Sequence, residues 1–222
     1  MRRATICAFL LTFAAANGAF ALTENFDSGA AGDWTEVQGT WAVANGEYTQ
    51  SDLTWATTAT NETYHRSYFG DASWTDYTVE ATVRIDESGG VAAILGIFFR
   101  VTEKSAGGDY YLFRLDERPA EGPALVKAPN TIIQENLEKP AALGVDYVLK
   151  VEVEGDSIRC YVDGVLEIDV TDSDFATGAV GVGTFDAVGS FDDVSVSGVG
   201  IATPVEARGK LPNVWARLRS AY

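Results

Sequence analysis

Two arginines on expected strands are the residues best placed to do chemistry. In segment 96–101, Arg100 shares a face with Phe98, and in segment 110–116, Arg114 shares a face with Tyr110. If the two strands are neighbours, one outward surface carries both guanidinium groups, which bind hydroxyls or carboxylates, and aromatic rings, which stack on sugars. The same pattern also fits an exposed ladder in which the arginines pair with acids on adjacent strands.

A loop-rich segment, 55–74, offers further aromatic side chains for a recognition surface. The segment is too polar and irregular to be one core strand, and aromatic residues on such loops commonly form the rim of a ligand site. Trp74 also fits a place in the core. The expected ligand-binding set is Phe98, Arg100, Tyr110, Arg114, Trp55, Tyr68 and Trp74.

The composition excludes several classes of function. The 222 residues include 32 acidic and 16 basic side chains, a formal net charge of −16, whereas a nucleic-acid-binding protein needs a basic surface. His65 is the only histidine and no Gly-x-Ser-x-Gly motif is present, which argues against a serine triad. We expect His65 to lie in a loop or at a rim. Two cysteines and one histidine cannot build a Cys/His zinc cluster.

Alternation of apolar and polar residues predicts antiparallel β-strands through the body of the chain. Segments 78–85 and 147–154 place apolar side chains on one face and mostly charged or hydroxyl side chains on the other. Glycine-bearing turns separate such segments, and the Asn-Gly pair at 45–46 and the Asp-Gly pair at 163–164 favour tight hairpins. Many short strands predict an all-β antiparallel sandwich or jelly roll.

The amino-terminal residues read as an export signal. Residues 1–21 begin with two arginines, continue with an apolar run and end in Ala-Phe-Ala, the pattern of a removable secretory signal peptide. Its removal takes Cys7 away, which leaves Cys160 alone and excludes an intrachain disulfide. No other apolar stretch is long enough to span a membrane. We therefore expect an extracellular, cell-surface or periplasmic protein with one domain over residues 22–198.

The carboxyl-terminal segment, 199–222, has a different composition. Residues 204–222 carry four basic side chains and one acid, and apolar residues recur there at helical spacing. The pattern predicts a short helical tail. Such a tail would dock on the acidic body, bind a protein partner or sorting machinery, or fray.

Several motifs in sequence order resemble the concanavalin A-like lectin/glucanase superfamily, and within it the laminin-G-like domains of secreted bacterial proteins. Their order and spacing across 23–197 imply a jelly-roll sandwich. This superfamily contains lectin-like modules, adhesion domains and glycosidases, so the resemblance is more specific for fold than for function. The motifs stand at 25–27, 33–35, 39–48, 74–79, 96–100, 109–115, 160–165, 178–181 and 191–196.

The resemblance leaves three functions open. The favoured one is a non-catalytic module that binds a glycan or a surface partner; the others are a glycoside hydrolase and a structural surface protein. Glucanases of the superfamily use a Glu-x-Asp-x-x-Glu motif whose carboxylates act as nucleophile and acid/base. Segment 167–172 reads Glu-Ile-Asp-Val-Thr-Asp and follows a hairpin turn. We therefore expect the solvent face of an ordinary strand there and assign no catalytic residue.

An acid-rich stretch suggests a structural cation. Residues 160–203 contain eight acids and neither lysine nor arginine, and calcium takes carboxylate and carbonyl oxygens as ligands. Proteins that resemble this chain often hold calcium where the first and last strands meet. The resemblance implies Asp192 as a ligand, with Asp27 and the carbonyl of Gly46 as neighbours. The alternative is a solvated acidic surface.

Overall fold

The computed structural model describes residues 20–54, 57–58, 61–62, 64–198 and 201. The predicted signal peptide and basic tail therefore lie almost wholly outside the described residues. Within the described residues no helix is long and apolar enough to cross a membrane. The strands are β1 Phe20–Glu24, β2 Thr35–Gln38, β3 Trp41–Ala44, β4 Glu47–Gln50, β5 Thr57–Thr58, β6 Asn61–Glu62, β7 His65–Phe69, β8 Tyr77–Ser88, β9 Ile94–Val101, β10 Tyr111–Asp116, β11 Ala124–Lys127, β12 Thr131–Glu135, β13 Asp146–Glu154, β14 Ser157–Val162, β15 Val165–Thr171, β16 Ala179–Phe185 and β17 Ala187–Gly198.

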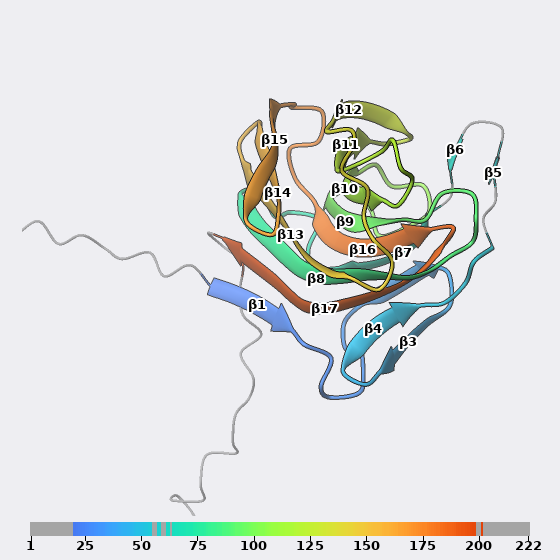
Figure 1. The fold of residues 1–222 in the computed structure, drawn as a ribbon. Helices are drawn as coiled ribbons and strands as arrows, with labels where there is room; N and C mark the ends of the chain where they lie inside the picture. The colour runs from blue at the N-terminus through green and yellow to red at the C-terminus, as the bar shows by residue number, and fades with distance from the viewer. Residues whose placement is uncertain (1–19, 55–56, 59–60, 63, 199–200, 202–222) are drawn as a thin grey trace, which may run out of the picture.

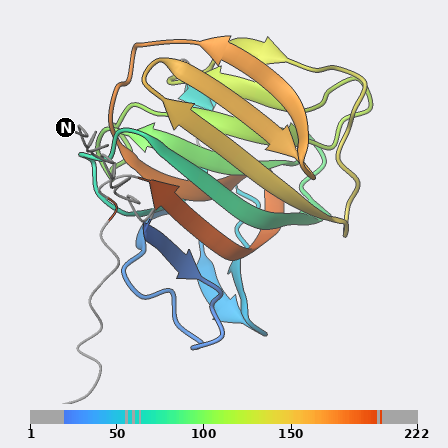
Figure 2. The same ribbon diagram turned by 90° about the vertical axis from the view of Figure 1, so that its left-hand side faces the viewer.

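Two curved antiparallel sheets face each other, which confirms the predicted all-β sandwich (Figures 1 and 2). The first sheet has the order β15-β14-β13-β8-β17-β4-β3, with β1 also paired to β17. The second sheet has the order β12-β11-β10-β9-β16-β7-β2, and β5 and β6 form a separate small hairpin. The tight turns follow the sequence rule, because Asn45, Gly46, Asp163 and Gly164 all have positive φ.

The main core lies between the two sheets, where the period-two pattern predicts it. The inward side chains of β8 and β13 meet those of β9 and β10, including Val83, Val151, Ile97 and Phe113. A second apolar cluster lies on the other face of the second sheet and includes Phe98, Tyr110 and Leu112. Strands β9, β10 and β16 are consequently buried on both faces. For β9 and β10 the sequence pattern predicts only one buried face.

Strand β17 joins three neighbours because its ladder is interrupted. On one edge it pairs with β8; on the other it pairs with β4 through Gly189–Phe191 and then with β1 through Val194–Gly198. A register shift falls between Asp192 and Ser195, where Asp193 has a φ of 48°. The end of β1 and the start of β4 therefore meet beside Asp192.

Candidate functional site

One row of paired residues across the second sheet has an arginine at each end and two glycines between them. Arg66 of β7 pairs with Gly183 of β16, Gly183 pairs with Gly96 of β9, and Gly96 pairs with Arg114 of β10. Three strand spacings of about 4.8 Å put the two arginine Cα atoms roughly 14 Å apart. Arginine side chains are long enough to extend over the glycines between them.

Aromatic rings pack against the glycines of this face. In the next row Tyr68 pairs with Gly181, which pairs with Phe98. A Cβ on Gly181 would lie 2.4 Å from Cδ1 of Tyr68, and one on Gly183 would lie 2.8 Å from Cε2 of Phe98. Only glycine leaves room for rings this close to the sheet. The ring of Phe98 meets the rings of Tyr64, Tyr68 and Tyr110 edge-on.

The arginines hold these rings together. The Arg66 guanidinium lies 5.3 Å from the ring centroid of Tyr110 and donates hydrogen bonds to the Tyr68 hydroxyl, the Gln38 side chain and the Ala106 carbonyl, each at 3.2 Å. Nη1 of Arg114 donates to the Tyr64 hydroxyl at 3.1 Å. We call Tyr64, Arg66, Tyr68, Phe98, Tyr110 and Arg114 the arginine–tyrosine cluster. Burial raises the pKa of Tyr68 to about 12, so its hydroxyl stays protonated at neutral pH.

The charge of the cluster has no counter-charge among the described residues. Arg66 and Arg114 are each only 5% exposed, yet no described carboxylate lies within 4 Å of either. Both Nε atoms are buried and have no acceptor among the described residues, which is also true of Nε of Arg100. The nearest acid along β10, Asp116, is taken up by Arg118 at 2.6 Å. Since buried charges are normally paired, two buried guanidinium groups without a described acid beside them are unusual.

Four predicted ligand-binding residues come together in this cluster, but not on an open surface. Arg114, Tyr110, Phe98 and Tyr68 share the outer face of the second sheet, and each is at least nine-tenths buried. The prediction of a freely outward surface is therefore wrong. Sequence reasoning also missed Arg66, although Arg66 and Tyr68 alternate along β7 in the same way as the residues that it selected.

Arg100 does not join Arg114, which corrects the sequence prediction. Arg100 has a φ of 49° beside a register shift between β9 and β16, so the side-chain alternation breaks there. Its guanidinium donates to the carbonyls of Gly155, Phe175 and Ala176 and lies 3.8 Å from Asp76. It is a structural clamp, buried between elements.

Trp74 and His65 also lie away from the predicted positions. Trp74 packs against the main core, with its ring edge-on to Phe69 and Tyr77, so the core alternative is correct. His65 is neither in a loop nor at a rim: it is a buried strand residue whose ring contacts the Thr54 carbonyl. The side chain of Trp55 lies outside the described residues.

The carboxylates of segment 167–172 contact different groups and do not form a pair. Lys139 binds Glu167 at 2.7 Å, and Asn136 also donates to that carboxylate. Asp172 accepts hydrogen bonds from the Tyr111 hydroxyl and from Lys127. Asp169 is exposed on β15, the strand predicted there. Nothing in these contacts favours a catalytic pair.

The predicted calcium ligands meet where the ladder of β17 is interrupted. A Cβ on Gly46 would lie 3.3 Å from Oδ1 of Asp27, so these two residues are neighbours. The pKa of Asp192 is raised, mainly by burial and further by the negative charges of Asp193, Glu47 and Asp27. No group of three or more acidic, histidine or cysteine side chains in the described chain is arranged to hold a metal. Backbone carbonyls would have to complete a calcium shell.

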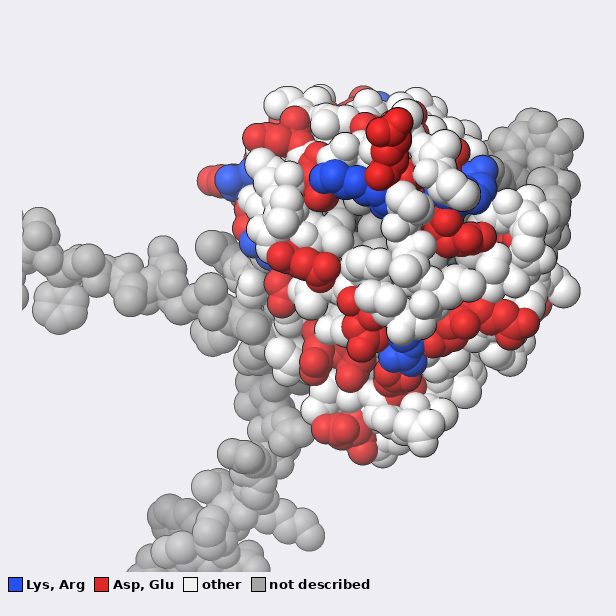
Figure 3. All heavy atoms as spheres, viewed as in Figure 1, with Lys and Arg blue, Asp and Glu red and all other residues white. Residues whose placement is uncertain are grey.

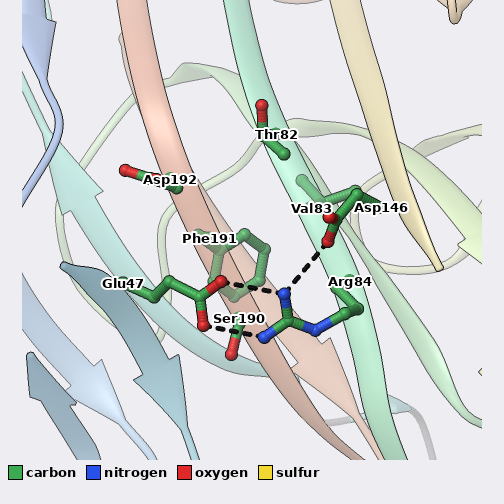
Figure 4. Close-up of a pocket in the computed structure, with 8 residues that line it drawn as sticks. All are labelled: Glu47, Thr82, Val83, Arg84, Asp146, Ser190, Phe191 and Asp192. Atoms are coloured by element: carbon green, nitrogen blue, oxygen red, sulfur yellow. Dashed lines mark hydrogen bonds and ion pairs between the residues drawn. The ribbon is translucent and has the colours of Figure 1, made fainter. Parts of the chain in front are cut away.

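Arg84 neutralises the acids on the other side of this junction (Figure 4). It lies 2.7 Å from Glu47 and 3.0 Å from Asp146 and also contacts Asp86. These contacts raise the pKa of the arginine, and the hydrogen bond with Glu47 contributes most. In Figure 4 the Asp192 side chain points away from Arg84. Asp192 therefore keeps a carboxylate without a basic partner in the described chain.

Part of the chain is similar in sequence to segments of two curated enzymes. No family model matches the chain. The chain is 31% identical over 166 residues to a levanase of Bacillus subtilis, covering 73% of this chain and 22% of the levanase. It is 32% identical over 155 residues to an extracellular exo-α-L-arabinofuranosidase of Streptomyces chartreusis, covering 68% of this chain and 17% of that enzyme. The chain thus spans about a fifth of the length of the curated relatives that it matches.

Two solved structures show the same architecture. The carbohydrate-binding module CBM66 from Bacillus subtilis has 28% sequence identity and a TM-score of 0.62, and the match covers 74% of this chain and 95% of the module. A β-glucanase of Bacillus licheniformis has 12% identity and a TM-score of 0.55, covering 82% and 98%. The chain therefore has the two-sheet jelly-roll fold of the concanavalin A-like proteins, and among these neighbours it is similar in both sequence and structure to a carbohydrate-binding module.

Proposed function

We propose that the protein is an exported, non-catalytic carbohydrate-binding module and that the arginine–tyrosine cluster holds the sugar. The observation that carries this proposal is the pair of buried arginines, Arg66 and Arg114, which face aromatic rings and lack a carboxylate partner among the described residues. Arginine forks bind vicinal oxygens, and aromatic rings pack against the apolar faces of sugars. The cluster combines both in one cross-strand neighbourhood.

The relatives support a binding role rather than catalysis. Two different glycosidases and a carbohydrate-binding module share this segment, and it makes up about a fifth of each enzyme. A segment common to enzymes that act on different sugars fits recognition better than bond cleavage. The laminin-G-like assignment stays a prediction, as does export through residues 1–21, which the extracellular arabinofuranosidase supports by similarity.

Binding to immobilised polysaccharides tests the proposal directly. The purified chain is run by affinity electrophoresis and titration calorimetry against levan, arabinan, xylan, pectin and alginate. We expect retention on at least one glycan and loss of at least tenfold in affinity in Arg66→Gln and Arg114→Gln. Arg159→Gln is the matched control, because Arg159 lies on the first sheet and pairs with Glu152. Unchanged affinity in both cluster variants would remove the cluster as the site.

Catalysis is tested on the same substrates. The proposal predicts no release of reducing sugar above the blank during prolonged incubation. If release occurs and Glu167→Gln abolishes it, the module is instead a glycoside hydrolase, which the fold also supports. If the chain neither binds nor cleaves any glycan, the structural surface-protein alternative gains.

We also propose that calcium binds beside Asp192. The support is the junction of β1, β4 and β17, where a carboxylate with a raised pKa lies near Asp27 and Gly46. Bound calcium would neutralise the charges that disfavour ionised Asp192 and would tie the first strand to the last. Its role is stabilisation, away from the arginine–tyrosine cluster.

A further inference from the structure

Arginines in the described chain divide into two classes. Arg84, Arg100, Arg118 and Arg159 each have a carboxylate within 4 Å. Arg66 and Arg114 have none among the described residues, although each is only 5% exposed. Acids are plentiful in a chain with a net charge of −16. A general shortage of carboxylates therefore does not explain why these two arginines have none beside them.

These two arginines place positive charge where little solvent reaches it. Each residue is only 5% exposed, so two guanidinium charges lie where little water can solvate them. Hydroxyl groups of a neutral sugar accept hydrogen bonds but leave that charge unbalanced. A ligand with its own negative charge supplies both the acceptors and the counter-charge.

The unused donors favour a planar anion. Arg114 donates from Nη1 to Tyr64, and its Nε–H has no acceptor among the described residues. Arg66 uses both terminal nitrogens on Tyr68, Gln38 and Ala106 and likewise leaves Nε–H without an acceptor. A carboxylate matches the planar guanidinium edge with two parallel hydrogen bonds, which are shorter and stronger than those to neutral oxygens.

We propose that the cluster recognises a glycan that bears carboxylate groups, a uronic-acid-containing polysaccharide, with Arg114 as the principal carboxylate partner and Arg66 as the second positive charge. This inference rests on the proposed glycan-binding function. It deepens that function by assigning a charge to the ligand, which the neutral sugars named by the relatives do not carry.

The acidic surface does not prevent such binding. Figure 3 shows acidic side chains spread widely over one face of the molecule, with few basic ones between them. At physiological ionic strength, fields from exposed charges decay over about 8 Å. Interactions at a buried guanidinium are screened much less than interactions between exposed charges. The positive charge of the cluster therefore decides which ligand charge is preferred there.

The test compares each acidic polysaccharide with its own carboxyl-reduced form, in which the uronic acid becomes the corresponding neutral sugar. The purified chain is titrated with polygalacturonate, alginate, glucuronoxylan and hyaluronan in both forms, with levan and arabinan as neutral glycans and dextran sulfate as a non-carboxylate polyanion. We expect at least one native acidic glycan to bind ten times more tightly than its reduced form and more tightly than dextran sulfate. Arg114→Lys should lose most of that difference, because it keeps the charge but not the fork.

Each outcome decides something. Equal affinity for native and reduced forms, or binding of levan or arabinan alone, overturns the carboxylate inference and leaves the glycan-binding function standing. Equal affinity for dextran sulfate overturns the preference for a carboxylate over other anions. Failure to bind any glycan removes the proposed function and the inference together. Arg159→Gln should behave as the parent protein in every arm.

Discussion

Replacing Arg114 by methionine should make the protein more stable while it removes glycan binding. Methionine has a similar length and volume, so it fills the space beside Phe98 without large repacking. The substitution loses one hydrogen bond, from Nη1 to the Tyr64 hydroxyl at 3.1 Å, which contributes about 1.5–3 kcal/mol when the donor is charged. It also removes the desolvation cost of an uncompensated charge that is 95% buried, which amounts to several kcal/mol.

The desolvation term is the larger one, so the expected gain is about 1–3 kcal/mol. For a chain of this size, 1 kcal/mol shifts the midpoint of thermal unfolding by about 2–4 °C. Arg114→Met should therefore raise Tm by about 2–12 °C in a melting experiment without glycan. A functional residue that costs stability in the free protein is the expected trade-off at a binding site.

Arg100→Met is the matched control. Arg100 is equally buried, but it satisfies three backbone carbonyls and lies near Asp76, so its loss should lower Tm. If Arg114→Met also lowers Tm by 2 °C or more without glycan, Arg114 is an ordinary structural residue. The charge argument for the site would then fail.

Four further predictions concern the rest of the molecule. Calcium added after chelation should raise Tm, by the equivalent of about 2.7 kcal/mol at a hundredfold excess over Kd, and Asp192→Asn should abolish that rise; an unchanged melting curve for the parent protein would contradict the calcium site. Because the folded-state pKa of Asp192 is raised, its ionised form costs stability above that pKa, and protonation restores stability as pH falls through it; Asp192→Asn should therefore raise Tm in chelator at neutral pH but not in strong acid. Gly70→Ala should lower stability by at least about 2 kcal/mol, because its Cβ would lie 2.2 Å from the Trp74 ring, whereas Gly29→Ala, with a similar positive φ and open space around it, should lose only about 1 kcal/mol in a denaturant titration. Cys160 is fully buried and burial raises the pKa of its thiol, so a thiol reagent should label it only after unfolding, and rapid labelling of the native protein would contradict its place in the core.

The sequence predicted what depends on local alternation. The inward faces of β8, β10 and β13 and the hairpins at 45–46 and 163–164 agree with the pattern because each follows from neighbouring residues alone. The shared face of Arg114 and Tyr110 follows from the same rule.

The errors arose where distant segments decide the geometry. Arg100 turns away because of a register shift against β16, where a Cβ on Gly178 would lie 2.1 Å from the Arg100 carbonyl carbon. The second apolar cluster covers residues that a one-sided sheet would expose. Arg66 becomes a partner of Arg114 only through the row of Gly96 and Gly183 between them. The alternation of residues within one strand does not predict the order β7-β16-β9-β10 in the sheet.

Because the ladder of β17 is interrupted, β1 covers a stretch of its edge that β4 does not reach. Beyond the register shift, β1 is the strand of the described chain that occupies this side of β17, through five residue pairs from Phe20–Gly198 to Glu24–Val194. Cleavage after Ala21 would take two of these pairs and leave three. A chain that began after Glu24 would expose unpaired N–H and C=O groups along Val194–Gly198, and such an edge invites a strand from another molecule. We therefore expect a chain cut after Glu24 to self-associate more readily than one cut after Ala21, although β1 belongs to the sheet opposite the arginine–tyrosine cluster.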